Sequence, residues 1–191
     1  MVIAAVGAVS VATPGLVAGA SAIPNISPPA ACDVPARSHH EIAALLAESN
    51  VATPAATTGG QTLPEGVPAG TTSSAAMERV VRLWLACQNA GESLRAWSLF
   101  SDGYLYRLLS RQEVMSSEAY GELSTPTTAA EASTLVEIEG QRILPDGRYG
   151  ATVVIAYPSV PMPKRFFFYF TEVDSRLLID GILGEISFSV P

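Results

Sequence analysis

From about residue 75 onward, apolar side chains recur first at intervals of three and four residues and later at intervals of two. The first run starts near Ala75 and ends at Asn89-Ala90-Gly91. An α-helix brings residues three and four apart onto one face, so this spacing predicts an amphipathic helix with one buried stripe. The stripe consists of Met77, Val80, Val81, Trp84 and Cys87 or Gln88.

Two shorter helices are expected to follow the long one. Leu94 and Trp97 mark the first, and Ser101-Asp102-Gly103 separates it from a second that starts at Tyr104. Asp102 lies where this last helix begins, and an Asp there usually accepts backbone hydrogen bonds as an N-cap. The three helices therefore face one common apolar partner.

Further along the chain, apolar residues recur at every second position, which indicates β-strands. Pro145-Asp146-Gly147 is typical of a hairpin turn between the first two strands. Helices followed by an antiparallel meander predict an α+β fold, with the helices on one face of the sheet. The expected strands are at residues 136–144, 149–157, 165–170 and 177–183.

The first 22 residues have the features of an export signal. No charged residue occurs from Val2 to Ala22, and the apolar run is broken by Pro14-Gly15. Small residues offer cleavage sites before Ser21 and before Ile23, although no basic residue precedes the apolar run. We therefore expect residues 1–22 to be a signal peptide; retention as a membrane anchor and an ordinary N-terminus are the alternatives.

Two further segments precede the domain. Ser38 and Glu41 have the spacing of a capping box, which predicts a short helix within residues 23–49. That helix carries Ile42, Leu45 and Leu46 on one face and either docks or frays. Residues 50–74 are rich in Thr, Gly, Pro and Ala and are expected to form a flexible linker, which places the domain at residues 75–191.

The chain has two cysteines, Cys32 and Cys87, one on each side of this linker. An even number of cysteines in an exported chain predicts a disulfide, which would hold the short helix on the domain. Two separate thiols are the alternative.

The net charge of the chain bears on which macromolecules it can bind. The chain has a formal net charge of −7, and its 11 Lys and Arg residues are not gathered into a stripe. A nucleic acid is therefore not an expected partner.

The order of these parts resembles the nuclear-transport-factor-2-like (SnoaL-like) superfamily, in its secreted bacterial form. The similar positions extend from about Ala75 to Ile186, with Leu177 where many relatives carry Trp. The resemblance implies a curved antiparallel sheet wrapped around the long helix, a cone whose open end can form a pocket. It rests on Asn89-Ala90-Gly91-Glu92, Leu99-Phe100-Ser101-Asp102, Tyr104-Leu105 and Leu177-Leu178-Ile179-Asp180-Gly181-Ile182.

The enzymes of this superfamily use an Asp or His base with a Tyr or a second acid. Both histidines, His39 and His40, precede the linker, so the candidate bases are Asp180 and Asp102. Glu137 and Glu139 alternate with Val136 and Ile138 and are expected to face water. No metal-ligand set or cofactor motif is recognised. The candidates for lining a pocket are Trp84, Tyr104, Tyr157, Phe168 and Phe170.

These observations favour a secreted, non-catalytic binding or interaction module with a small apolar ligand in the cone. The rival hypothesis is a small isomerase or dehydratase that uses a pocket carboxylate and a Tyr. A cone plugged by Trp84, Phe168 and Phe170 favours the module; a buried carboxylate beside a Tyr in an open cavity favours the enzyme. A homodimer through the sheet is a second expected partner, and a membrane is one only if the leader is retained.

Overall fold

The computed structural model describes residues 31–47, 63–111 and 125–184, and the signal peptide expected at 1–22 lies outside these ranges. The described chain contains four α-helices and five β-strands. They are α1 (His39–Ala47), β1 (Val67–Pro68), α2 (Thr71–Asn89), α3 (Ser93–Trp97), α4 (Asp102–Arg111), β2 (Thr134–Ile143), β3 (Tyr149–Ala156), β4 (Lys164–Val173) and β5 (Arg176–Leu183).

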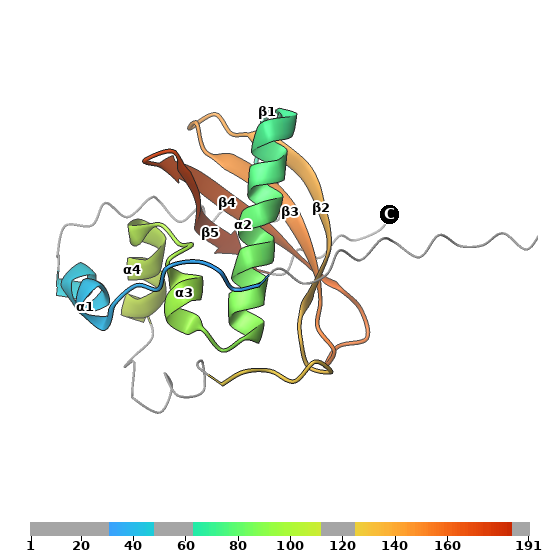
Figure 1. The fold of residues 1–191 in the computed structure, drawn as a ribbon. Helices are drawn as coiled ribbons and strands as arrows, with labels where there is room; N and C mark the ends of the chain where they lie inside the picture. Colours follow the sequence, from blue (N-terminus) through green and yellow to red (C-terminus); the bar gives the residue numbers. More distant parts are fainter. Residues whose placement is uncertain (1–30, 48–62, 112–124, 185–191) are drawn as a thin grey trace, which may run out of the picture.

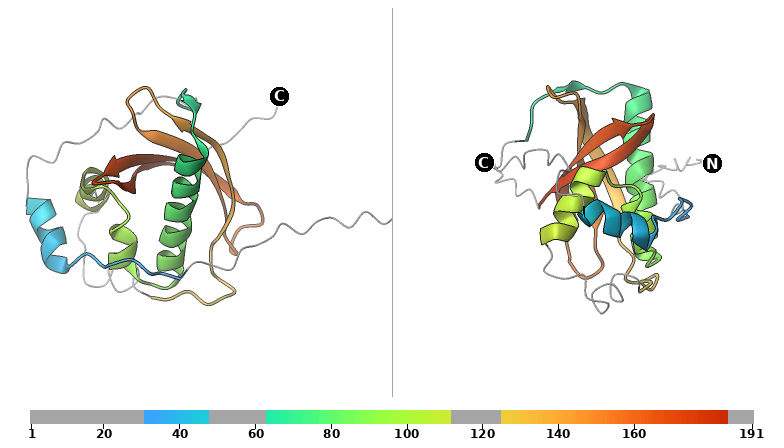
Figure 2. Two further views of the ribbon diagram at one scale, coloured as in Figure 1. Left: turned by 45° about the horizontal axis from the view of Figure 1, so that its top comes forward. Right: turned by 90° about the vertical axis from the view of Figure 1, so that its left-hand side faces the viewer.

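The strands form one antiparallel sheet in the order β1-β2-β3-β4-β5. Figure 1 shows α2 crossing one face of this sheet, with α1, α3 and α4 grouped beside β5. The sheet is curved and bends around α2 (Figure 2). The expected α+β class is therefore confirmed, with the predicted meander and with helices packed on one sheet face.

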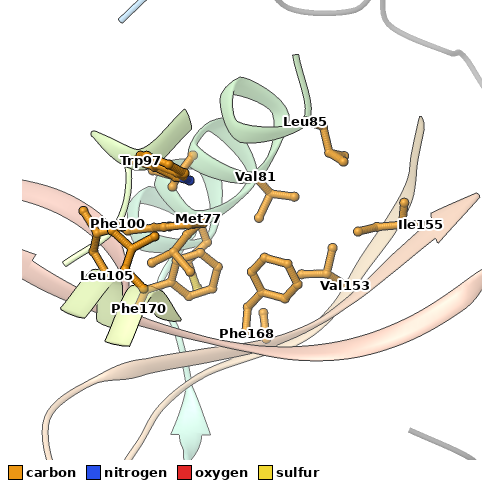
Figure 3. Packing of buried hydrophobic residues seen from close by; sticks show 14 of the residues in the cluster. Met77, Val81, Leu85, Trp97, Phe100, Leu105, Val153, Ile155, Phe168 and Phe170 are labelled. Carbon is orange, nitrogen blue, oxygen red and sulfur yellow. The ribbon is translucent and has the colours of Figure 1, made fainter. Parts of the chain in front are cut away.

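The main hydrophobic core lies between α2 and the concave sheet face. Met77 and Val81 project from α2, and Phe168 and Phe170 project from β4; all four are fully buried. Figure 3 shows these side chains interleaved with residues of α3, α4 and β3. The core confirms the predicted helix stripe, because the three-and-four spacing brings the apolar side chains of α2 onto one side.

Residues 31–47, called here the N-terminal strap, are fastened to the domain by the predicted disulfide. The Sγ atoms of Cys32 and Cys87 are bonded, and their Cα atoms lie 4.6 Å apart. At the start of α1 the Ser38 backbone N–H donates to Glu41 and the Glu41 N–H donates to Ser38 Oγ, as a capping box requires.

Docking of α1 is also observed. Ile42 and Leu45 are 6% and 7% exposed and belong to the main core. Leu46, which we had grouped with them, is 38% exposed. The reason is helix geometry: in a nine-residue helix with two anchors, the next position already turns toward solvent.

Two boundaries differ from the sequence-based expectation. Helix α2 begins at Thr71, four residues before Ala75, and Val67–Pro68 forms β1 against the end of β2. Part of the segment expected to be a linker is therefore regular structure, while residues 50–62 lie outside the described residues. The first turn of α2 was not predicted, because its Thr and Ser residues do not contribute to the apolar spacing.

The alternation along β2 is also interrupted. Val136 is 54% exposed, although alternation predicts that it faces the core with Ile138. A register shift between Leu135 and Glu137 in the pairing with β3 explains the difference, because a bulge inserts one residue and reverses the facing of its neighbours.

Candidate functional site

Asp180 lies in an irregular part of β5, at the edge of the sheet. In the pairing with β4, Tyr169 lies opposite Gly181 and Phe170 lies opposite Ile179, so Asp180 is the extra residue of a bulge. The preceding residue, Ile179, faces the core. Successive residues of a strand face opposite sides of the sheet, so Asp180 points away from the core while Ile179 faces it.

The segment between α3 and α4 covers this edge of β5. The Ile179 N–H donates to the Leu99 carbonyl at 2.8 Å, and the Ser101 N–H donates to the Ile179 carbonyl at 2.9 Å. Arg107 of α4 donates to the Asp180 carbonyl at 2.8 Å. The backbone of Ile179 and Asp180 is therefore held by hydrogen bonds to the α3–α4 segment and to α4.

Both carboxylate oxygens of Asp180 accept hydrogen bonds. Ser101 Oγ donates to Oδ1 at 2.6 Å, and Arg148 donates to Oδ2 at 3.0 Å. The Asp180 side chain is 6% exposed and that of Arg148 is 20% exposed, so this ion pair is largely shielded from water. A carboxyl group held in this way has a structural role, because proton abstraction would require it to give up a hydrogen bond.

Arg148 connects Asp180 to the β2–β3 hairpin. Its guanidinium pairs with Asp146 at 2.8 Å and lies 4.6 Å from the centroid of the Tyr169 ring. The side-chain hydrogen bond from Arg148 lowers the pKa of Asp146. Burial disfavours the charged form of Arg148, but hydrogen bonds to Asp146 and Asp180 outweigh burial and raise its pKa. Arg148 therefore keeps its positive charge beside Asp146 and Asp180.

Asp102, the second candidate base, is a surface residue. Its side chain is 64% exposed and pairs with Arg37 of the strap at 2.6 Å. The N-cap role expected for it was wrong by one residue, since Ser101 Oγ accepts from the Tyr104 N–H at 3.1 Å. Asp102 occupies the first helical position instead, and the structure does not bring it together with Asp180 as a catalytic pair.

The aromatic candidates fall into two groups. Phe168 and Phe170 are fully buried and stack with centroids 6.1 Å apart. Trp84 is half-buried and contacts Phe168 at 5.6 Å and Phe100 at 6.5 Å, and Phe100 contacts Tyr104 at 5.1 Å. These rings form a continuous row from α4 through α2 to β4, and Trp84 and Tyr104 are its partly exposed members.

Tyr157 lies outside this row. It is half-buried and packs edge-on against Phe166, with centroids 6.3 Å apart. Burial raises its pKa above the usual value. Ring contacts therefore join four of the five pocket candidates and leave Tyr157 apart. All five belong to the main core or pack against it.

Trp84 carries an unpaired donor. Among the described residues, two buried polar side-chain atoms have no hydrogen-bond partner, namely Trp84 Nε1 and the Tyr169 hydroxyl. A buried donor without an acceptor costs about 1–3 kcal/mol. At Trp84 the Nε1 atom is buried, although the residue as a whole is partly exposed.

Tyr104 is the tyrosine of the aromatic row, and its phenol is hard to ionise. Burial raises its pKa to about 12, although Arg107 acts in the opposite direction. The unfolded chain releases this proton near pH 10, so stability is fully present below about pH 10 and declines toward about pH 12.

Tyr104→Phe should therefore flatten the alkaline loss of stability. Urea unfolding at a series of alkaline pH values measures this effect, and phenolate absorbance in the folded state identifies the group. Equal slopes for the variant and the parent protein would contradict the assignment.

Residues 31–47, 63–111 and 125–184 hold no group of three or more His, Cys, Asp or Glu side chains arranged for a metal ion. None of the helices in these ranges is both long and apolar enough to cross a membrane. His39 and His40 are exposed in the first turn of α1. A depression of about 400 Å³ lies on another side of α2, lined by Ala75, Glu78, Arg79, Arg82 and Leu83.

Sequence reasoning missed three residues that organise this region: Ser101, Arg148 and Arg37. Ser101 was detectable as a possible N-cap, because it directly precedes the predicted helix. Arg148 follows the predicted hairpin turn, but its contact with Asp180 spans 32 positions. Arg37 bonds the Phe100 carbonyl across 63 positions, and local spacing does not predict such contacts.

No protein-family model, no curated protein and no solved structure matches this chain in comparisons with known proteins.

Proposed function

We propose that this chain is an exported, non-catalytic binding module for a small, mainly apolar ligand that carries an oxygen acceptor. The observation that supports this most strongly is the state of Asp180. Its two oxygens are bonded to Ser101 and Arg148, and it is 4% exposed. The isomerase or dehydratase hypothesis needs a free base, and neither Asp180 nor the exposed Asp102 meets that need.

The aromatic row supports the apolar character of the ligand. Phe168 and Phe170 already fill the space between α2 and the sheet, so the ligand would contact the partly exposed end of the row at Trp84 and Tyr104. Aromatic rings offer large apolar contact area at low entropic cost. The unpaired Trp84 Nε1–H would then donate to the oxygen of the ligand.

The same proposal includes the fold family and the location. Helices packed on the concave face of a curved antiparallel meander agree with a nuclear-transport-factor-2-like cone. The Cys32–Cys87 disulfide agrees with an oxidising compartment, since such bonds form and persist outside the cytosol. An uncharged leader with small-residue cleavage sites also supports a location outside the cytoplasm.

The probe for this function is 1-decanol, with decane as the matched hydrocarbon. We expect saturable quenching or enhancement of tryptophan fluorescence by decanol. Trp84→Phe should weaken decanol binding about tenfold, which corresponds to one hydrogen bond of about 1.4 kcal/mol. It should change decane binding much less, because Phe keeps the aromatic surface and lacks the donor.

Binding to the Trp84→Phe protein is followed by calorimetry, so that loss of the fluorophore does not matter. Asp180→Asn, if folded, is the control and should leave decanol binding unchanged, because Asp180 is structural in this proposal. Absence of saturable decanol binding by the parent protein would refute the ligand class.

A further inference from the structure

The N-terminal strap is attached to the domain by contacts of three kinds. Figure 1 shows it running from the C-terminal end of α2, past α3, to α1 beside α4. Apolar contact comes from Ile42 and Leu45. Polar contact comes mainly from Arg37, which donates to the Phe100 carbonyl at 2.9 Å and pairs with Asp102. The covalent contact is the Cys32–Cys87 bond.

The noncovalent part of this attachment is small. The α1 helix has nine residues, and two of its side chains are buried. Asp102 is 64% exposed, and ion pairs with exposed partners contribute little. Two further hydrogen bonds join strap and domain: the Arg37 backbone N–H donates to the Leu94 carbonyl at 3.1 Å, and the Arg95 guanidinium donates to the Val34 carbonyl at 2.8 Å. A helix this short is marginal in water without tertiary contacts.

Docking of the strap depends on the disulfide, whereas folding of the rest of the domain does not. Cys87 is fully buried in α2, and its carbonyl accepts the Glu92 N–H in the helix-terminating turn. A reduced cysteine at this position remains a small apolar side chain in an apolar site. The core between α2 and β4 consists of other residues, among them Met77, Val81 and Phe168.

The two sulfur-bearing residues differ in access. Cys32 is partly exposed at one end of the strap, whereas Cys87 is fully buried. An incoming thiolate therefore reaches the Cys32 sulfur first. Attack there forms a mixed disulfide on Cys32, breaks the Cys32–Cys87 bond and releases the Cys87 sulfur as a thiolate that takes up a proton.

We propose that this disulfide is a redox latch: an extracytoplasmic dithiol reductant releases the N-terminal strap while the domain stays folded. The second thiol of the reductant attacks the mixed disulfide and frees Cys32. Two electrons and two protons pass from the dithiol to the cystine, which leaves two protein thiols and an oxidised reductant. Release uncovers the face of α4 that α1 contacts in the oxidised protein. This proposal rests on the proposed extracytoplasmic location and does not depend on the proposed ligand.

Hydrogen exchange of the full chain with and without dithiothreitol tests the latch. After reduction, the amides of α1 should exchange at least about tenfold faster, because a lost tether lowers the effective concentration of the strap beside its site. Amides of β3 and β4 should keep their protection. Unchanged α1 exchange, with thiol titration confirming reduction, would overturn the proposal, and so would equal loss of protection in α1, β3 and β4.

Two controls complete this test. Cys32→Ser without reductant should reproduce the fast exchange of α1, and adding dithiothreitol to it should have no further effect. Brief exposure of the parent protein to glutathione, followed by acid quenching, should place the mixed disulfide on Cys32. An adduct confined to Cys87 would overturn the order of attack.

Discussion

Arg148→Met destabilises the folded domain by about 3–5 kcal/mol, because it leaves the Asp180 carboxylate buried without its cationic partner. Met keeps much of the side-chain length, so the loss reports charge more than packing. Urea unfolding followed by circular dichroism measures the change. Arg176→Met is the matched control, since Arg176 is an exposed arginine of β5; it should change stability by less than about 0.5 kcal/mol.

A second variant separates ion pairing from other effects of Arg148. Replacing both partners, Arg148→Met with Asp180→Leu, should recover part of the lost stability, because no uncompensated charge then remains in the interior. If Arg148→Met cost no more than Arg176→Met, Asp180 would not need its partner. In that case the carboxylate would again be a candidate base.

Phe168→Ala should lower the free energy of unfolding by about 3–5 kcal/mol, through lost burial and the cavity left behind. Phe168 is fully buried and contacts both Trp84 and Phe170. Phe166→Ala is the control on the same strand, because Phe166 is partly exposed and should lose less. Thermal and urea unfolding both report the difference. Equal, small losses at both positions would mean that Phe168 lines an open cavity and is not part of a packed core.

The sequence contained enough information for the parts of this fold that depend on local period. The stripe from Met77 to Cys87 predicts the buried side of α2, because three-and-four spacing can be satisfied in one way on a helix. Ser38 and Glu41 predicted the start of α1 for the same reason, since a capping box is a local device. The Cys32–Cys87 bond followed from the number of cysteines and the expected compartment.

Features that depend on the pairing of distant segments could not be predicted in this way. The facing of Val136 is set by a bulge, which shifts the register by a residue that alternation alone does not show, and a second bulge lies at Asp180. The choice of Ser101 over Asp102 as N-cap differs by one position, and both residue types suit the role. Arg148 was missed as a partner of Asp180 because the β2–β3 hairpin and β5 come together only after the sheet forms.

The most direct test of the proposed binding function is the indole N–H resonance of Trp84 in ¹⁵N-labelled protein during a decanol titration. The chain has two tryptophans, so Trp84→Phe assigns the resonance and Trp97, which is 4% exposed, serves as internal reference. We expect a saturable downfield shift of the Trp84 resonance that decane does not produce, while the Trp97 resonance stays in place. A Trp84 resonance that does not move, or moves no more than that of Trp97, would contradict it.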